Sequence, residues 1–346
     1  MSGDVIDRNG TAPRDGTAPR EGTAPQEGAT PRPVAGIDIG GTKIATLLVD
    51  ADGAVLGRAT HASSVGDQGG AVASIAACLD DALQGASLAR HDLAAVGVGV
   101  PGRVDPERGH VTLAVNLGWT DFALRDELQT TLHTPVVIEN DVRAAAVGLY
   151  ERHVIDGAEN IAYLAVGTGI AAGVVLDGKL HRGARGLAGE IGHAIVELGG
   201  PRCQCGQNGC LEAFASGPSI ARRAGATSAK EVYERAAAGD AAAQALTEDV
   251  GRRLAWAIHT LVMTYDVQRV VVGGGVSHAG SPFEAPLRRE LERLREASAL
   301  AGELLPADIV DVLPPEAEAG AWGAVAVART AIARTTDRGS EVVSHA

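Results

Sequence analysis

Three cysteines and one histidine lie close together in a glycine-rich stretch of this 346-residue chain. Cys203, Cys205 and Cys210 follow the spacing C-x-C-x4-C, and His193 precedes them. Because glycine lets the backbone double back without steric cost, three sulfurs and one imidazole can converge on one point. Three thiolates and one imidazole are the ligand set of a closed, tetrahedral zinc site. The stretch therefore predicts a structural Zn²⁺.

Two other interpretations of these cysteines are open: ordinary reduced thiols, or a disulfide between neighbours. The clustering favours the metal, because Cys78 is the one cysteine outside the group. Glu190 precedes His193 by three positions, and Glu212 follows Cys210 by two. A loop folded around a metal would therefore hold two carboxylates in fixed positions.

A second candidate is a tight turn that follows a buried strand and begins with a carboxylate. Backbone N–H groups in such a turn can hold phosphate oxygens, and the carboxylate of Asp38 could bind a hydrated Mg²⁺. The spacing is not that of a P-loop, and a plain hairpin turn is the alternative. The residues involved are Asp38, Gly40, Gly41, Thr42 and Lys43.

Two further glycine turns come after apolar runs in the second half of the chain. One is Gly167-Thr168-Gly169, which repeats the first turn, and a hairpin is again the alternative. A pair of such turns, one in each half, could clamp a phosphate chain from two sides. The other, Gly273-Gly274-Gly275, could pack bare backbone against a nucleotide or be a flexible loop.

Asn140 and Asp141 stand at the junction between an expected strand, residues 135–139, and an expected helix, residues 142–153. A lone aspartate at such a junction is commonly a helix cap. Together with Glu190 and Glu212, however, Asp141 suits a kinase that acts on a sugar. That reaction needs a carboxylate to accept the hydroxyl proton, and otherwise mainly positioning and charge stabilisation.

Composition excludes several classes of function. The formal net charge of −13 argues against binding to nucleic acids or anionic membranes. No apolar run approaches the ~20 residues of a membrane span, and we expect no signal peptide. Few, clustered cysteines fit a reducing cytoplasm better than a disulfide scaffold.

The chain divides into segments of different character. Residues 1–33 form a degenerate six-residue repeat rich in proline and glycine, which we expect to be a disordered tail. Residues 34–141 alternate strands and helices and predict an N-terminal α/β domain, completed by a helix over residues 317–333. Within this domain we expect a short hairpin around residues 107–109 and a helix over residues 122–132. Residues 142–316 predict a second α/β domain that carries the zinc loop, and residues 336–346 a loose tail. Residues 36–59 and residues 161–180 each show strand, glycine turn, strand and hairpin, an internal repeat that predicts two similar domains facing a cleft.

The motifs taken together resemble the ROK family of repressors, open-reading-frame proteins and sugar kinases. The resemblance covers residues 34–330 and rests on the ordered series of motifs. These are D-I-G-G-T-K at residues 38–43, E-N-D-V-R-A-A-A at 139–146, G-T-G-I at 167–170, G-E-I-G-H at 189–193 and C-x-C-G-x-x-G-C-L-E at 203–212. It implies the actin/hexokinase-like (ribonuclease-H-like) fold, with closure of the two domains on sugar.

The resemblance also implies roles for individual residues. Asp141 would be the general base that takes the proton from the sugar hydroxyl. His193 would serve twice, with one nitrogen on zinc and the other toward the sugar. The turns at residues 38–43 and 167–169 would be the two phosphate motifs, and residues 273–275 the adenosine motif. The implied sugar-pocket residues are Gly102, Asn116, Asn140, Glu190, His193 and Glu212.

One departure from the family pattern G-T-G-I-G-G-G is the presence of Ala171 and Ala172. Methyl groups there restrict the backbone and push it back from a ligand. Either the affinity for nucleotide is reduced, or the strand begins earlier.

We therefore expect an ATP-dependent hexose kinase that makes glucose 6-phosphate, with ATP, Mg²⁺ and a structural Zn²⁺. A kinase for an N-acetylated hexosamine or for fructose shares the same sugar motif and is the alternative within the class. A sugar-sensing regulator without catalysis is the alternative from another class. The resemblance further implies a homo-oligomer.

Overall fold

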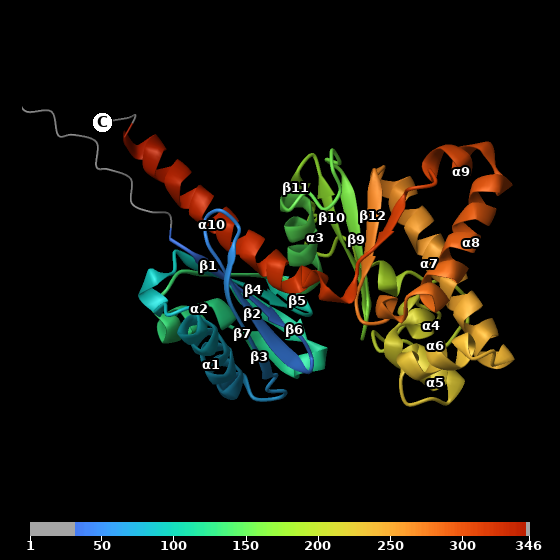
Figure 1. Cartoon of the computed structure of the whole chain (residues 1–346), viewed down its shortest axis with the longest axis horizontal. Coiled ribbons are helices and arrows are strands. Elements are labelled where there is room, and N and C mark those ends of the chain that lie inside the picture. The colour runs from blue at the N-terminus through green and yellow to red at the C-terminus, as the bar shows by residue number, and fades with distance from the viewer. Residues whose placement is uncertain (1–31, 344–346) are drawn as a thin grey trace, which may run out of the picture. The chain divides into compact units, whose positions relative to one another are not determined.

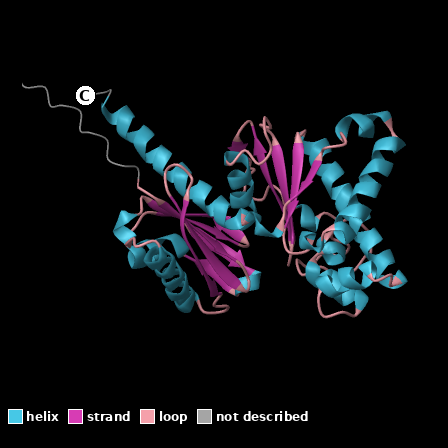
Figure 2. Ribbon diagram, viewed as in Figure 1, coloured by secondary structure: helices cyan, strands magenta, loops and turns pink. Residues whose placement is uncertain are grey.

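The structure is a computed structural model that describes residues 32–343. Two main sheets of five strands each organise these residues (Figure 1 and Figure 2). The first sheet has the strand order β3-β2-β1-β4-β8. Its strands are β1 (Val34–Ile39), β2 (Lys43–Val49), β3 (Val55–Ala62), β4 (Ala95–Val100) and β8 (Val136–Asn140).

The second sheet has the strand order β11-β10-β9-β12-β13, the same topology as the first. In each sheet three strands form an antiparallel meander, and two further strands add in parallel to the other side of its first strand. The internal repeat predicted from the sequence is confirmed. The strands are β9 (Ile161–Val166), β10 (Ile170–Leu176), β11 (Lys179–Leu180), β12 (Arg269–Gly273) and β13 (Val310–Val312).

The central strands read as unbroken apolar runs because both faces of the sheets are covered. All six residues of β4, A-V-G-V-G-V, are buried. The first sheet packs against α1 (Gln68–Gly85) and shares a core with α2 (Leu124–Leu132). The second shares its core with α7 (Ala241–Tyr265) and α8 (Ser281–Ala297).

A small sheet of three antiparallel strands follows β4 in the chain. Its first two strands, β5 (Arg103–Asp105) and β6 (His110–Ala114), form the hairpin expected around residues 107–109. The third, β7 (Trp119–Phe122), takes residue 122, which the sequence assigned to a helix. Trp119 and Phe122 are buried there in edge-to-face contact, so tertiary packing overrides the local helical spacing.

The remaining helices are α3 (Asp141–Glu151), α4 (Glu212–Ala215), α5 (Gly217–Ala224), α6 (Ala229–Ala237), α9 (Ala299–Leu304) and α10 (Ala319–Val343). The described residues also form short 3₁₀ helices, which are η1 (Arg90–Asp92), η2 (Val115–Leu117), η3 (Ile191–His193), η4 (Ser277–Ala279) and η5 (Pro315–Ala317).

The last helix, α10, packs on β1 and β4 of the first sheet and on α3 (Figure 1). The two helices touch backbone to backbone at a pair of glycines. A Cβ added to Gly148 would lie 2.6 Å from the amide nitrogen of Gly323, and one added to Gly323 would lie 2.3 Å from the carbonyl carbon of Ala144. Since α3 also packs against β9 and β10, this crossing connects elements of both main sheets.

Several predicted boundaries differ from the structure. The expected tail of residues 1–33 lies outside the described residues as far as residue 31. Arg32 and Pro33, however, are held by backbone atoms of residues 91–94. At the other end α10 continues to Val343, whereas a loose tail was expected from residue 336. Residues 336–343 contain no proline to stop the helix. Among the described helices, none is long and apolar enough to cross a membrane.

The crossing of α3 and α10 gives a prediction on stability. Gly323→Ala should lower the free energy of unfolding by about 1–3 kcal/mol, because the methyl group overpacks a backbone contact. Chemical denaturation of both proteins measures the change. Gly85→Ala is the matched control: Gly85 ends α1 with open space around its Cα, so this variant should be neutral or slightly stabilised. Equal stability of Gly323→Ala and the parent protein would contradict the packing described.

Candidate functional site

The four predicted zinc ligands converge in space. His193, Cys203, Cys205 and Cys210 lie on the loop between β11 and α4, and their ligand atoms all lie within 4.8 Å of one another. Two isolated bridges, Ile195 with Cys210 and Arg202 with Asn208, fold the loop back on itself. The predicted ligand set is therefore brought together by the tertiary structure.

The distances between these ligand atoms fit a tetrahedrally coordinated cation better than a disulfide. Ligands about 2.3 Å from a zinc ion are about 3.7 Å apart. The Sγ atoms of Cys205 and Cys210 are 3.7 Å apart, and Nδ1 of His193 lies 3.8 Å from Sγ of Cys203. A disulfide requires about 2.05 Å, and all four cysteines are free thiols.

His193 also faces one of the predicted sugar ligands. Its Nε2 lies 4.0 Å from Oε2 of Glu190, while Nδ1 is the nitrogen turned to the cysteine cluster. The two ring nitrogens therefore point to two different partners. This is the arrangement that a histidine shared between a metal and a sugar would need.

The loop that carries Glu190 and His193 lies against β10 with no room for side chains. A Cβ on Gly189 would lie 1.8 Å from the carbonyl oxygen of Ala172, and one on Gly192 would lie 2.0 Å from that of Ile170. The amide of Ala172 donates to the carbonyl of Gly189 over 2.7 Å. These two glycines let the backbone approach β10 closely enough to place Glu190 and His193.

Asn140, rather than Asp141, caps the helix α3. Oδ1 of Asn140 accepts from the amide of Arg143 over 3.1 Å. Its Nδ2 donates to Oδ1 of Asp141 over 2.9 Å and to the carbonyl of Gly102 over 3.1 Å. The amide of Val142 donates to the same Asp141 oxygen. Asn140 thus orients the carboxylate of Asp141, and its contact brings Gly102 into the site.

Asp38 and Asp141 lie where the parallel strands β1, β4 and β8 of the first sheet end. In the register of β1, β4 and β8, Asp38 is opposite Gly99, and Gly99 is opposite Glu139. A Cβ on Gly99 would be 3.7 Å from Oδ1 of Asp38 and 3.5 Å from Cα of Asp141. The absence of a side chain at residue 99 therefore leaves the two carboxylates near one another.

Burial raises the pKa of both carboxyls. It raises the pKa of Asp141 to about 6, against hydrogen bonds to its carboxylate and the nearby Arg143 charge, which lower it. Burial and the Asp141 charge raise the pKa of Asp38 to about 7, and Lys43 opposes them. A carboxyl with a pKa of about 6, as for Asp141, is suited to accept a proton at neutral pH, and a bound cation would lower the pKa of Asp38.

The predicted first phosphate turn adjoins the predicted sugar pocket. The amide of Gly40 donates to the carbonyl of Lys43 over 2.8 Å and closes the turn. A Cβ on Gly41 would lie 4.0 Å from Cβ of Asn116, a predicted sugar-pocket residue. Gly320, at the start of α10, lies directly against Asp38, because a Cβ added to it would be 2.3 Å from Oδ2 of Asp38.

The predicted second phosphate turn, residues 167–169, is adjacent to Glu212. The amide of Gly167 donates to the carbonyl of Gly169 over 2.9 Å, and Oε2 of Glu212 accepts from the amide of Ile170 over 2.9 Å. A Cβ on Gly167 would lie 3.9 Å from the amide of Gly275. The turn at residues 167–169 and the glycine loop at residues 273–275 are therefore neighbours, and Glu212 links the turn to the cysteine loop.

The two alanines that depart from the family pattern belong to the strand. β10 begins at Ile170, and Ala171 and Ala172 pair with β9. Ala172 is buried in the core of the second sheet. For Ala172 the structure thus favours the interpretation that the strand begins early. Ala171 is half-buried on the opposite face of the strand, and its effect on a ligand stays a prediction.

Sequence reasoning missed three charged residues close to the site. Glu139 and Arg143 are buried, and Arg182 pairs with Glu139. A signal was present: Glu139 lies in an otherwise apolar strand and Arg143 in an alanine-rich helix, so each needs a partner. The partner Arg182 is distant in sequence and could not be identified without the fold.

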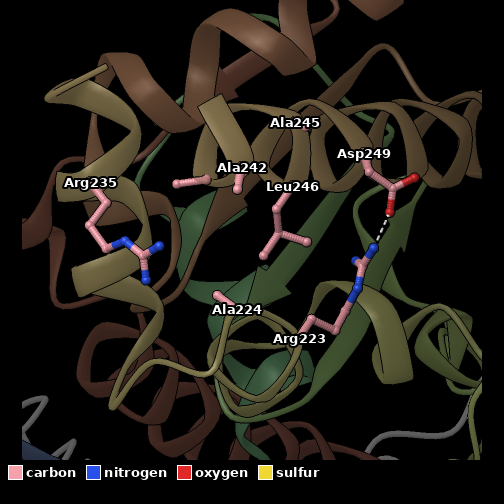
Figure 3. Close-up of a pocket in the computed structure, with 8 residues that line it drawn as sticks. Arg223, Ala224, Arg235, Ala242, Ala245, Leu246 and Asp249 are labelled. Atoms are coloured by element: carbon pink, nitrogen blue, oxygen red, sulfur yellow. Dashed lines mark hydrogen bonds and ion pairs between the residues drawn. The ribbon is translucent and has the colours of Figure 1, made fainter. Parts of the chain in front are cut away.

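Two hollows are lined by residues between 168 and 249. One, of about 380 Å³, contains none of the predicted site residues (Figure 3). It lies among α5, α6 and α7, where Arg223 pairs with Asp249 over 2.7 Å. The other is smaller, about 40 Å³, and is lined in part by Thr168, Cys203 and Glu212. The smaller hollow therefore adjoins the second phosphate turn and the cysteine loop.

Comparison with known proteins assigns the family. The glucokinase of Halalkalibacterium halodurans is 34% identical over 278 residues, which cover 74% of this chain and 84% of that protein. An N-acetylmannosamine kinase of Escherichia coli is 38% identical over 249 residues, covering 70% of this chain and 83% of that protein.

Solved structures agree. A ROK family glucokinase from Streptomyces griseus, in complex with glucose and AMPPNP, matches with a TM-score of 0.74 and 33% identity over 86% of this chain and 99% of that chain. A ROK hexokinase from Thermus thermophilus matches with a TM-score of 0.72 and 32% identity over 87% of this chain and 99% of that chain. The profile of the ROK family matches residues 34–331, and the chain belongs to this family, with the actin/hexokinase-like α/β fold.

Proposed function

We propose that this protein transfers the γ-phosphoryl group of ATP to a hexose, and that glucose is the acceptor and glucose 6-phosphate the product. The observation that carries the proposal is the oriented carboxylate of Asp141. This carboxylate lies beside Asp38, which begins the glycine turn of residues 38–43. The same chain carries the loop with the four predicted zinc ligands. The glucokinases among the relatives support glucose as the acceptor.

The proposed reaction follows from the roles of these residues. Asp141 accepts the proton of the sugar hydroxyl as its oxygen attacks the γ-phosphorus, and ADP leaves. Asn140 keeps the Asp141 carboxylate in orientation through the bond between their side chains. Glu190, His193, Glu212 and Asn116 hold the ring. Asp38 fits Mg²⁺, which would neutralise phosphate charge.

The same proposal includes the nucleotide contacts and the ligands of zinc. It also includes a division into two domains, residues 34–141 and residues 142–316, with α10 completing the first. The two sheets of equal topology and the packing of α10 on β1 and β4 support the division. We further expect a cytoplasmic location, because the cysteines are few and clustered, and a homo-oligomer (dimer or tetramer), as the family resemblance implies.

A second acceptor has support of its own. The N-acetylmannosamine kinase of Escherichia coli is 38% identical over 249 residues, against 34% over 278 residues for the glucokinase of Halalkalibacterium halodurans. An N-acetylated hexosamine is therefore the alternative substrate, and a test must include it.

Incubation with ATP, Mg²⁺ and a panel of hexoses, read out as ADP release, tests the function. We expect turnover with glucose, and a loss of roughly 10²-fold or more in kcat for Asp141→Asn, because the base is removed. Asp156→Asn, at an exposed position after α3, is the control and should keep normal turnover. If turnover is seen with N-acetylmannosamine alone, that sugar and not glucose is the acceptor. If no sugar is turned over, the result favours a regulator without catalysis.

The raised pKa of Asp141 predicts a pH dependence. The base must be ionised, so kcat/KM for glucose should fall as the pH drops through about 6, whereas an unburied carboxyl would place this limb near 3.8. Initial rates from pH 5 to 8 measure it, with circular dichroism at each pH to exclude unfolding. A flat profile down to pH 5 would contradict the assignment of Asp141.

Removal of the metal gives a third prediction. The purified protein should contain about one equivalent of zinc per chain. Cys203→Ser should lose the zinc and raise the KM for glucose, because His193 and Glu190 lose their anchor. Elemental analysis and steady-state kinetics measure both effects. Cys78→Ser, outside the cluster, should keep the zinc. A folded, active and metal-free protein would refute the site.

A further inference from the structure

A charged cluster connects two segments that the sequence places more than forty residues apart. Glu139, at the end of β8, is completely buried, with 0% of its surface exposed. Its Oε2 accepts from Nε of Arg182 over 2.8 Å and lies 2.7 Å from Nη2 of the same arginine. Arg182 follows β11 and begins the glycine-rich loop of residues 182–193. A strand of the first sheet is thus ion-paired to the loop that leaves the second.

Arg143 adds a second connection between the same two segments. It lies in the first turn of α3, is 3% exposed, and its Nη1 lies 3.7 Å from Oε1 of Glu139. Its Nη2 donates to the backbone carbonyl of Gly186, in the middle of the loop. The loop is therefore held at residue 182 by a side chain and at residue 186 by its backbone.

The cluster also reaches the base itself. The other oxygen of Glu139 accepts from the amide of Asn140 over 2.9 Å. The side chain of Asn140 in turn donates to the carboxylate of Asp141 and accepts from the amide of Arg143. One buried carboxylate therefore contacts the backbone of the base-bearing turn and the arginine that begins the loop carrying Glu190 and His193.

A purely stabilising role does not explain this arrangement well. Burying charges costs solvation energy that their attraction barely offsets, so a buried ion pair is weak evidence for stability. It does define a geometry, because a shift of either partner would leave a buried charge unpaired. Catalysis by positioning needs such a defined geometry, since a misplacement of about 1 Å can cost a hundredfold in rate.

We propose that Glu139, Arg143 and Arg182 are positioning residues, which hold the loop of residues 182–193 in register with the turn at Asn140 and Asp141. The inference rests on the proposed function, because it assumes that Glu190 and His193 bind the acceptor sugar. None of the three residues belongs to the glycine turns at residues 40–43 or 167–169. Their removal should therefore affect the acceptor and spare the nucleotide.

The kinetic test uses Arg182, the most exposed of the three, whose side chain is 38% exposed. Arg182→Ala should lower kcat/KM for glucose roughly ten- to a hundredfold and leave the KM for ATP within about twofold. Arg182→Lys should recover part of the loss by restoring the charge. In the background of Glu139→Gln, Arg182→Ala should add little, because the pair is already broken.

Arg185→Ala is the matched control. Arg185 lies in the same loop, is exposed, and makes no ion pair with the residues that the structure describes. It should leave both KM values unchanged. Two results for Arg182→Ala would overturn the inference: an unchanged kcat/KM for glucose, or a KM for ATP that is impaired as much as the kinetics with glucose.

Amide hydrogen exchange separates this inference from the proposed function. Without any substrate, residues 183–193 should exchange about tenfold faster or more in Arg182→Ala than in the parent protein or in Arg185→Ala. If the parent protein phosphorylates no sugar, the proposed function fails, while the exchange result still decides whether the cluster holds the loop. Unchanged exchange in Arg182→Ala would overturn the inference whatever the activity.

Discussion

Two buried carboxylates at one edge of a sheet are the constraint on which the rest of the site depends. The parallel register of β1, β4 and β8 brings Asp38 and Asp141 to the same edge, on either side of Gly99. Burial disfavours their charged forms and raises both pKa values. The surrounding groups offset this cost in part: Lys43 acts on Asp38, and Arg143, Asn140 and the amide of Val142 act on Asp141. In the proposed reaction, a cation at Asp38 and a sugar hydroxyl at Asp141 would complete the compensation.

The second half of the molecule supplies the groups that would hold an acceptor next to this edge. The cysteine loop folds on itself, and His193 turns one nitrogen inward and the other toward Glu190. Gly189 and Gly192 allow the preceding loop to lie directly on β10. Arg182 and Arg143 then attach that loop to β8 and α3. The cysteine–histidine cluster and the charged cluster thus lie at opposite ends of the segment of residues 182–193.

Much of this could be predicted because the signals are local. Strands ending in glycine turns, the C-x-C-x4-C spacing and the strand–helix junction at Asn140 and Asp141 each depend on neighbours in sequence, and the structure forms these elements where they were expected. Errors arose where distant contacts decide. Phe122 joins a strand because it packs on Trp119, and Asn140 takes the cap because its donors find Gly102 and Asp141. The roles assigned to individual site residues stay predictions.

The sequence by itself determined which chemistry is available: three thiols and an imidazole for a cation, carboxylates for proton transfer, and glycine turns for phosphates. It also determined that two similar α/β halves would form, since hydrophobic periodicity and glycine positions are properties of short segments. The tertiary structure alone decided which charges meet. The pairing of Glu139 with Arg182, and the approach of Arg143 to Gly186, depend on two sheets and a loop coming together. No local pattern encodes that approach, because the free energy that drives it comes from burial of surfaces far apart in the chain.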